Sequence, residues 1–547
     1  MLAGRMMDYP LTLTHFLERA RTFFGSTEIV SRNADKSLTR STYGQMYRRA
    51  CQLAGALARL GVGPGDRVAT LCWNHQRHLE AYFGVPAMGA VVHTLNLRLH
   101  PNEIAYIAKH AEDRVLIVDR TLLPLYRKFA DQVPSIQHVI VVPDGPAQGA
   151  ETGSELDYEQ LLAAERDEYA FPRLDERAAA MICYTSGTTG TPKGVVYSHR
   201  SAVLHTLVNC MADVTGMSQA DSVTPVVPMF HAAAWGLPYT SVASGARLVF
   251  PGPHLDPASL LDLMSTEKVT VAAGVPTIWL GILQLLDQSP EKWDLSSMRT
   301  MLIGGSAAPP AMIDGFQRRH GLVVTHAWGM TETSPVGTMA RLKKSLSGLD
   351  DAAKLSLRAS QGYALPLVEQ RHVGENGDVL PWDGATMGEL EVRGPWVASS
   401  YFSDEGEDKF TADGWFKTGD VVTIDPEGYL RITDRSKDVI KSGGEWISSV
   451  DLENALMSHP AVLEAAVFAA RDAKWGERPL AAVVLKEGKS ATKEELTAHI
   501  EGKFAKYWLP DDYIFMTQIP RTSTGKFLKT KLREMYGDHL EKGAAAR

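Results

Sequence analysis

Residues 184–194, with the sequence YTSGTTGTPKG, gather glycines, hydroxyl groups and a lysine directly after the apolar run AAAMIC. The glycines allow positive φ and a close backbone approach, and the hydroxyls and Lys193 are groups that bind phosphate oxygens. The hydroxyls that could donate to phosphate include those of Thr185, Ser186, Thr188 and Thr189. Because Pro192 precedes Lys193 and Gly194 follows it, the segment is not a Walker A loop, which requires Gly-Lys-Ser/Thr. We therefore expect a phosphate-binding loop of another kind rather than an ordinary flexible loop.

Two later segments supply a backbone turn and a carboxylate. Residues 304–310, GGSAAPP, follow the apolar run TMLI, and their paired glycines suit a turn that lies against a flat ligand. Residues 326–335, HAWGMTETSP, contain Glu332, and a carboxylate beside phosphates suits Mg²⁺ because this ion prefers oxygen ligands. A buried tryptophan and a helix-capping Thr/Glu pair would explain Trp328, Thr331 and Glu332 without any ligand.

Three isolated charges lie further along the chain. Asp420 in WFKTGD and Arg435 in DRSKD, taken singly, would each pass as half of a solvated ion pair. Lys526 in IPRTSTGKFLK lies on a turn of small residues, and a lone lysine is usually solvated. Their order after the phosphate-binding segment gives them another interpretation.

These segments resemble the motifs of the adenylate-forming (AMP-binding) superfamily, which includes acyl-CoA synthetases, carrier-loading adenylation domains and luciferases. The similarity covers nearly the whole chain and is greatest to bacterial fatty-acyl-CoA synthetases of the medium- to long-chain type. It implies that ATP and a carboxylic acid give an acyl-adenylate and pyrophosphate, and that the acyl group then passes to coenzyme A. ATP and coenzyme A would be co-substrates, and Mg²⁺ would be required.

The resemblance assigns roles around ATP residue by residue. Trp328 would lie against the adenine, and Asp420 and Arg435 would hydrogen-bond to the ribose. The implied ATP and AMP contacts are Thr185, Ser186, Gly187, Thr188, Thr189, Gly190, Lys193, Gly304, Gly305, Ser306, Ala307, His326, Ala327, Trp328, Gly329, Met330, Thr331, Asp420, Ile432, Arg435 and Lys526. The implied Mg²⁺ ligands are Thr185 and Glu332.

The implied catalytic residues are Lys526, Glu332, Thr331, His231 and Lys193. Adenylation is the attack of a carboxylate on a triphosphate, so two anions must be held together and neutralised. Lys526 would bridge the carboxylate and the α-phosphate, Thr331 would contact a phosphate or adenylate oxygen, and His231 would lie near the reacting carboxylate. No covalent enzyme nucleophile is required.

Residues 225–246, PVVPMFHAAAWGLPYTSVASGA, resemble the acyl-binding segment of the superfamily. Trp235 would gate the mouth of a fatty-acyl tunnel, although His231 and Trp235 would also serve as plain core residues. The implied pocket comprises His231, Trp235, Val275, Gly305 and Gly329. Since its segments contain no charged residue that would select an amino acid, a neutral aliphatic tail is favoured.

Ala232 and Ala233 depart from the Val-Asn pair that the resemblance leads us to expect after His231. Smaller side chains would widen or reshape the pocket. A short acid, a methylthio-substituted propionate and an aryl acid therefore stay open beside a medium- to long-chain fatty acid.

The thioester-forming step would use residues 441–449, KSGGEWISS, with contacts to coenzyme A from Lys441, Ser442, Gly443, Gly444, Glu445 and Trp446. Lys437 matches the hinge position of the superfamily, where backbone rotation would swing the C-terminal domain between two working orientations.

Other functions remain open for these residues. An adenylating enzyme that loads a carrier protein would share the whole motif set, and luciferase-like oxygenation is available to the same fold. A non-catalytic nucleotide-binding protein is a further alternative, but Lys193, Glu332, Asp420, Arg435 and Lys526 all retain competent chemistry.

Short β-branched runs between helical patterns, such as RVATLCW from Arg67 and VLIVD from Val115, predict an α/β fold with largely parallel sheets. Residues 341–360 have helical spacing and are expected to pack as an insertion. After Gly388, short strands with turn pairs predict a small β unit. We expect an N-terminal adenylating domain at 1–434 and a small, mobile α+β domain at 435–547.

The composition is that of a folded globular protein, with 44% hydrophobic and 22% charged residues among 547. A net charge of −8 gives no reason to expect a nucleic-acid partner, and four scattered cysteines suggest neither disulfides nor a zinc site. No signal peptide or apolar span of membrane length stands out, so a cytoplasmic enzyme without an integral membrane segment is expected. A homodimer is an expectation from the resemblance alone.

Overall fold

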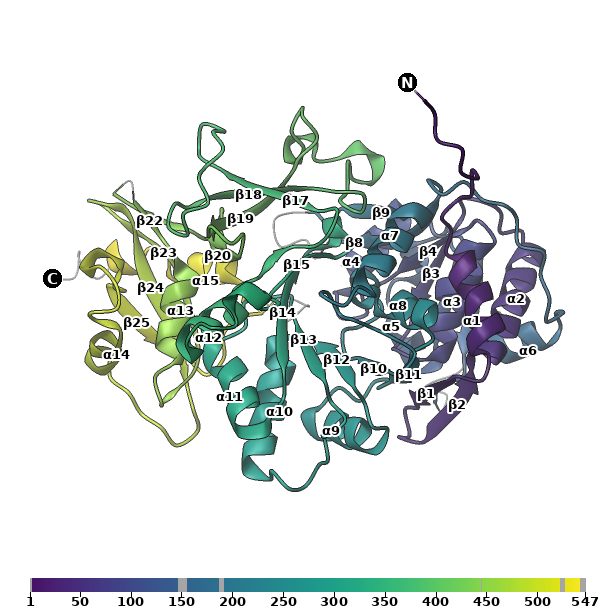
Figure 1. Cartoon of the computed structure of the whole chain (residues 1–547), viewed down its shortest axis with the longest axis horizontal. Helices are drawn as coiled ribbons and strands as arrows, with labels where there is room; N and C mark the ends of the chain where they lie inside the picture. Colours follow the sequence, from purple (N-terminus) through teal and green to yellow (C-terminus); the bar gives the residue numbers. More distant parts are fainter. Residues whose placement is uncertain (1, 146–154, 186–190, 444, 522–526, 542–547) are drawn as a thin grey trace.

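The computed structural model describes residues 2–145, 155–185, 191–443, 445–521 and 527–541 (Figure 1). Within these ranges the chain forms a mixed α/β fold of two large sheets and two smaller ones. The predicted fold class is confirmed, with a large N-terminal part and a small C-terminal part at opposite ends of the molecule in Figure 1.

The first large sheet has seven strands in the order β7-β6-β5-β3-β4-β8-β9. The strands are β3 (Arg67–Leu71), β4 (Val91–Thr94), β5 (Val115–Asp119), β6 (His138–Val142), β7 (Leu156–Asp157), β8 (Ala179–Tyr184) and β9 (Gly194–Ser198). All neighbours are parallel except β8 and β9. Alternate residues of β5 face opposite cores, as a pleated strand requires: Ile117 lies in one and Val118 in the other.

The second large sheet has nine strands in the order β16-β15-β14-β13-β12-β10-β11-β1-β2. They are β1 (Glu28–Arg32), β2 (Leu38–Thr42), β10 (Ser222–Pro225), β11 (Arg247–Phe250), β12 (Val271–Gly274), β13 (Thr300–Ile303), β14 (Val324–Gly329), β15 (Val336–Met339) and β16 (Tyr363–Ala364). The central neighbours are parallel, and β2, β15 and β16 join antiparallel at the ends.

Helices fill the space between the two large sheets and cover their outer faces. The largest core joins both sheets through α1 (Thr14–Phe24), α2 (Tyr43–Arg59), α3 (Gln76–Ala87), α6 (Tyr158–Ala163), α7 (His199–Asn209) and α8 (Leu237–Ser244). The outer face of the nine-stranded sheet packs on α9 (Pro257–Thr266), α10 (Pro276–Gln288) and α11 (Pro310–His320). The outer face of the seven-stranded sheet packs on α4 (Pro101–His110) and α5 (Leu123–Tyr126).

The expected helical insertion is shorter than its spacing indicated. The helix α12 runs only over Asp351–Ala359, within residues 341–360. Asp350 caps it by accepting a hydrogen bond from the Ala353 amide at 2.8 Å. A side-chain cap fixes where a helix begins, so the preceding residues are left outside it.

A small antiparallel sheet follows, with β17 (Glu369–Val373), β18 (Gly388–Arg393), β19 (Phe416–Ile424) and β20 (Leu430–Arg435). Its register sets Asp420 of β19 directly opposite Arg435 of β20. This sheet is the predicted small β unit.

The C-terminal part has its own sheet of β21 (Ile440–Ser442), β22 (Glu445–Ile447), β23 (Val462–Asp472), β24 (Gly476–Leu485) and β25 (Asp512–Phe515). Its helices are α13 (Ser449–Met457), α14 (Lys493–Ile500) and α15 (Lys529–Tyr536). Two hydrophobic cores on its faces draw their buried residues from position 440 onward. The boundary between 434 and 435 and the hinge at Lys437 stay predictions.

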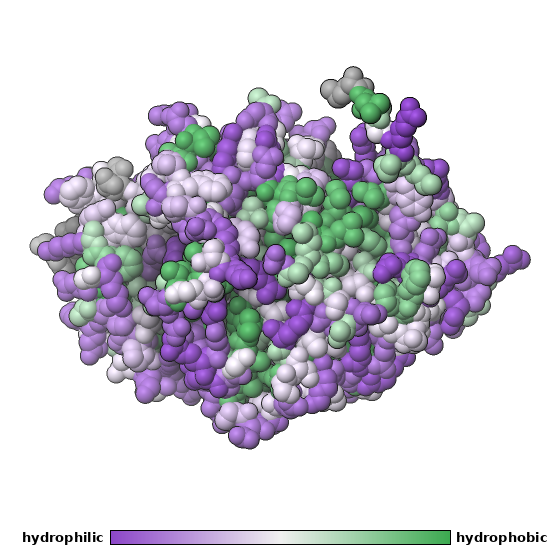
Figure 2. All heavy atoms as spheres, in the orientation of Figure 1, coloured by the Kyte–Doolittle hydropathy of each residue, from purple (hydrophilic) through white to green (hydrophobic). Residues whose placement is uncertain are grey.

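Among the described helices, none is both long and apolar enough to cross a membrane. Cys51, Cys72, Cys183 and Cys210 are free thiols. Figure 2 shows hydrophobic residues gathered near the centre of one face, over β9 and α7. Val196 of β9 and Leu207 of α7 are among the exposed apolar side chains.

Candidate active site

Three predicted site segments begin where strands of the two large sheets end. Thr185 follows β8, Gly304 follows β13, and Met330 follows β14. Ligands of α/β sheets bind beyond the carboxyl ends of the strands, so these positions are suited to a common site. The two sheets are tied here by Tyr197 of β9, whose hydroxyl donates to the carbonyl oxygen of Thr331 at 2.7 Å.

Trp328, Asp420 and Arg435 form one hydrogen-bonded group. The indole Nε1 of Trp328 donates to Oδ2 of Asp420 at 2.8 Å, and Nε of Arg435 lies 2.8 Å from Oδ1 of the same carboxylate. Asp420 is buried, whereas the Arg435 side chain is 38% exposed. Each carboxylate oxygen keeps a second lone pair, which a ribose hydroxyl could use.

The remaining nucleotide candidates lie around this group. His326 is buried, its Nδ1 lies 3.1 Å from the Ala359 carbonyl oxygen, and burial lowers the pKa of its imidazole. The Ile432 amide donates to Gln361 at 2.6 Å. A Cβ on Gly329 would lie 2.0 Å from the Pro335 carbonyl oxygen, so only glycine fits there. Ala327 is buried, Ala307 and Met330 are partly buried, and Ser306 is exposed.

The two ends of the phosphate-binding segment are joined to each other. The Lys193 amide donates to Oγ1 of Thr185 at 3.0 Å, and the Thr185 amide donates to the Lys193 carbonyl at 2.9 Å. Residues 186–190 lie outside the described ranges, and so do the predicted contacts of Ser186, Gly187, Thr188, Thr189 and Gly190.

Glu332 is buried and accepts a hydrogen bond at Oε1 from the hydroxyl of Tyr401 at 2.6 Å. The ring centroid of Tyr401 lies 5.0 Å from Nζ of Lys193, so one side chain contacts both predicted charges. The carboxylate of Glu332 and the hydroxyl of Thr185 are oxygen donors, the kind that Mg²⁺ prefers. These residues therefore fit the predicted metal by the chemistry of their donor atoms.

The acyl candidates follow an unusual backbone turn. Ala232, Ala233, Ala234 and Trp235 all have positive φ, between 43° and 58°. For residues with a Cβ this conformation costs about 1–2 kcal/mol each, and a β-branched side chain is a stronger outlier still. Alanine at 232, in place of the valine that the resemblance led us to expect, is therefore explained by the turn.

This turn sets Trp235 against the glycines that follow β13. A Cβ on Gly304 would lie 3.1 Å from Cη2 of Trp235 and 3.0 Å from the Ala327 carbonyl oxygen. A Cβ on Gly305 would lie 3.4 Å from Cγ1 of Val275. Trp235, Val275 and both glycines are thus neighbours. The acyl pocket as a whole stays a prediction. His231 is partly buried, and its amide donates to the Pro228 carbonyl at 3.0 Å.

The predicted coenzyme A segment lies in the C-terminal sheet. Nζ of Lys441 lies 3.1 Å from Oε1 of Glu375 and 5.2 Å from the ring centroid of Trp446. Ser442 is buried and accepts from Arg478 at 3.3 Å. Gly443 has φ of 61° and donates to the Trp475 carbonyl at 2.9 Å. Gly444, the side chain of Glu445 and Lys526 lie outside what the structure describes.

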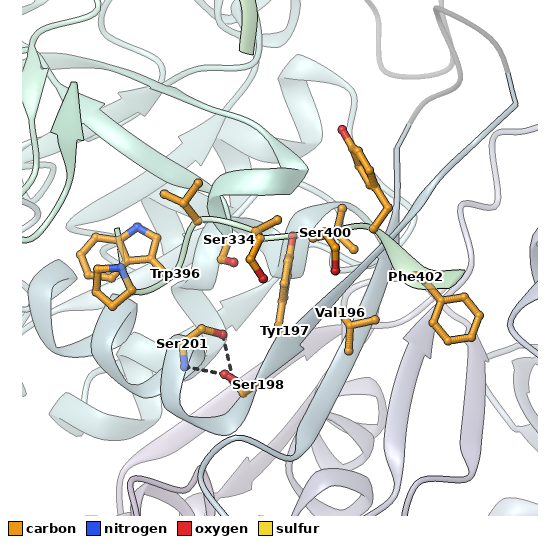
Figure 3. Close-up of a pocket in the computed structure, with 14 residues that line it drawn as sticks. Val196, Tyr197, Ser198, Ser201, Ser334, Trp396, Ser400 and Phe402 are labelled. Atoms are coloured by element: carbon orange, nitrogen blue, oxygen red, sulfur yellow. Dashed lines mark hydrogen bonds between the residues drawn. The ribbon is translucent and has the colours of Figure 1, made fainter. Parts of the chain in front are cut away.

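Tyr401 and Tyr197, which hydrogen-bond to Glu332 and Thr331, were not among the predicted site residues. Both line a pocket of about 280 Å³ between β9, the start of α7 and residues 395–402 (Figure 3). Several hydroxyls line it as well, among them those of Ser198, Ser201 and Ser334. A tyrosine in a serine-rich loop after a strand was the available signal, but it did not identify the partner.

Cys72, His75 and Asp119 form a group with metal-ligand chemistry elsewhere in the described chain. Nε2 of His75 lies 2.8 Å from Asp119, and the same carboxylate accepts from the Trp73 amide at 2.7 Å. Burial raises the pKa of the Cys72 thiol, which disfavours the thiolate that a metal would need. We interpret the group as an interior hydrogen-bond network.

Two family models match the chain. Residues 16–402 match the AMP-binding enzyme model, and residues 451–526 match the AMP-binding enzyme C-terminal domain. Two curated relatives align over nearly their full length. A long-chain-fatty-acid–CoA ligase of Thermus thermophilus is 50% identical, over 98% of this chain and 97% of the relative. A 3-methylmercaptopropionyl-CoA ligase of Ruegeria lacuscaerulensis is 44% identical, over 98% of this chain and 100% of the relative.

A solved structure shares the fold across the whole chain. It is the anthranilate CoA ligase AuaEII in complex with anthranoyl-AMP, at a TM-score of 0.85 and 27% identity. The match covers 99% of each chain.

Proposed function

The chain belongs to the AMP-binding enzyme family, and from this premise we propose that it adenylates a medium- to long-chain fatty acid and transfers the acyl group to coenzyme A. It is an AMP-forming acid–thiol ligase, for which ATP, a carboxylic acid and coenzyme A are the substrates. The observation that carries the proposal is the hydrogen-bonded group of Trp328, Asp420 and Arg435. A second observation is that Tyr401 contacts both Glu332 and Lys193.

The proposed roles follow from charge. Asp420 and Arg435 would hold the ribose, Trp328 would lie against the adenine, and Lys193 would contact the phosphates. Mg²⁺, when bound at Glu332 and Thr185, would neutralise charge on the triphosphate. Lys526 would bridge the acid and the α-phosphate where negative charge accumulates. The chain itself forms no covalent bond to the acyl group.

The fatty-acyl preference is supported by two observations. The Thermus thermophilus relative is named for a long-chain fatty acid as its substrate. The neighbours of the predicted acyl site, Trp235 and Val275, are apolar. The Ruegeria lacuscaerulensis relative, which is named for 3-methylmercaptopropionate, supports that compound as the second candidate acid. A Mg²⁺ requirement and a homodimer are proposed on the family resemblance, and the predicted cytoplasmic location stays a proposal.

The test is release of pyrophosphate and AMP by the purified protein with ATP and Mg²⁺. Straight-chain acids from short to long and 3-methylmercaptopropionate would each be offered with and without coenzyme A. Acyl-CoA and AMP formed from C8–C16 acids at a higher kcat/KM than from short acids are the expected result. Highest kcat/KM on 3-methylmercaptopropionate would replace the fatty-acid assignment. Pyrophosphate without a thioester would favour a carrier-protein acceptor, and bound but uncleaved ATP would favour the non-catalytic alternative.

A further inference from the structure

We infer that Tyr401 is a positioning residue, which holds the Glu332 carboxylate and the Lys193 ammonium apart and oriented for the adenylation step. The inference rests on the proposed function. Tyr401 lies outside the segments 184–194, 304–310 and 326–335, to which the resemblance assigned roles. Its assignment comes from the contacts that its side chain makes.

Tyr401 contacts each charge with a different part of its side chain. Its hydroxyl donates to Oε1 of Glu332 at 2.6 Å, and the face of its ring receives the Lys193 ammonium at 5.0 Å. A hydroxyl donor fixes the direction of one carboxylate lone pair, and an aromatic face attracts a cation without accepting a hydrogen bond. Among the described residues, neither the other carboxylate oxygen of Glu332 nor the Lys193 ammonium makes a hydrogen bond, so both can contact ligands.

The surroundings keep this tyrosine in place. The Ala398 amide donates to the Glu332 carbonyl oxygen at 2.7 Å, so the segment before Tyr401 is attached to the same residue. Phe410 packs edge-on against the Tyr401 ring at 5.8 Å. Beyond it, Glu405 lies 3.6 Å from Nε2 of His110 on α4. The segment is therefore fastened on both sides of the side chain.

Close packing suits the role. A Cβ on Gly406 would lie 2.4 Å from Nζ of Lys193 and 3.1 Å from Cδ2 of Tyr401, so glycine makes room for the contact.

Removing parts of this side chain should have separable effects. Tyr401→Phe keeps the ring beside Lys193 and loses the donor to Glu332. Tyr401→Leu loses both and leaves two opposite charges free to pair with each other, which would withdraw them from ATP. Tyr429→Phe is the matched control, because Tyr429 is also buried and its hydroxyl donates to the Arg341 carbonyl at 2.6 Å, outside the candidate site.

The experiment measures metal binding and the two half-reactions. Mn²⁺ affinity would be measured by electron paramagnetic resonance in the presence of the ATP analogue α,β-methylene-ATP. The rate of adenylation would be measured by pyrophosphate release from ATP. Thioester formation would be started from synthetic acyl-adenylate and coenzyme A. Tyr401→Phe is expected to weaken Mn²⁺ binding about tenfold and slow adenylation about 10- to 100-fold, with thioester formation within about twofold of wild type. Tyr401→Leu should in addition raise the KM for ATP, and Tyr429→Phe should change none of these values.

The inference would be overturned if Tyr401→Phe bound Mn²⁺ as tightly, and formed the adenylate as fast, as the wild type. Equal loss in both half-reactions, or an equal loss in Tyr429→Phe, would also overturn it, because either result marks a structural role. If wild-type protein made no adenylate, the proposed function would fail. The Mn²⁺ affinities of the variants would still decide the role of Tyr401.

Discussion

The indole nitrogen of Trp328 and the carboxylate of Asp420 are joined by a hydrogen bond of 2.8 Å, although β14 and β19 belong to different sheets. The same carboxylate pairs with Arg435, its register partner on β20. The small β-sheet is thereby attached to the end of β14, where the nucleotide is proposed to bind. This linkage makes the carboxylate a sensitive position to test.

Replacing Asp420 by asparagine should weaken ATP binding. The change keeps the shape of the side chain but removes the charge that faces Arg435 and the ribose hydroxyls. A hydrogen bond to a charged group contributes about 1.5–3 kcal/mol, so the KM for ATP should rise about 10- to 100-fold. Steady-state kinetics would measure it. The control is Asp413→Asn, which alters an exposed ion pair with Arg371 and should leave the KM for ATP unchanged.

Gly304→Ala should impair the use of the acid. The new methyl group would lie 3.1 Å from Cη2 of Trp235 and would displace the indole from its present place. A misplaced wall of the acyl site should lower kcat/KM for the fatty acid about tenfold or more. Gly348→Ala is the control, since a Cβ there meets nothing within 4 Å. Both variants would be measured by steady-state kinetics with varied acid concentration at saturating ATP. If the two variants behaved alike, Trp235 would not belong to the proposed acyl site.

Lys526→Ala should separate the two half-reactions. Its bridging role ends once pyrophosphate leaves, so adenylate formation should fall about 100- to 1000-fold while thioester formation from preformed adenylate stays within about threefold of wild type. Single-turnover assays of each half-reaction would measure the effect. Equal loss in both would exclude the bridging role. The residue lies outside the described ranges, so this prediction rests on the family resemblance.

The buried pair of Glu453 and Lys529, 2.7 Å apart, should make stability depend on pH. Burial raises the pKa of Glu453 from its ordinary value of 4.5 to about 7, against the opposing effect of Lys529. Between these values the folded state holds more protons than the unfolded state at this residue. Its contribution to the free energy of unfolding therefore falls as pH rises from about 4.5 to about 7 and is level above that.

Comparison with Glu453→Gln isolates this effect, because glutamine does not titrate. The wild type should lose stability relative to the variant across that window, by at most about 1.4 kcal/mol per pH unit. Thermal denaturation of both proteins from pH 4.5 to 8 would measure the difference. A difference that grew in favour of the wild type with rising pH would contradict the raised pKa.

The fold was predictable where local patterns are strong. The apolar runs beginning at Arg67 and Val115 became β3 and β5, because strands buried on both faces are continuously apolar. The helix within residues 341–360 was predicted too long, because spacing alone does not locate a cap such as Asp350. The left-handed turn at 232–235 was not predicted, because alanine has no preference for the left-handed region that would indicate such a turn.

Residue types and their order along the chain were enough to predict the chemistry of the candidate site: the hydroxyls and lysine after β8, the carboxylate of Glu332, and the order of segments that resembles the superfamily. Those features are local, because residue type and spacing along the chain carry them. Packing between the sheets, by contrast, brings Trp328 to Asp420 and Tyr401 to both Glu332 and Lys193. Such contacts join residues far apart in the chain, and they depend on sheet register and packing between layers, which the periodicity of a single segment does not encode.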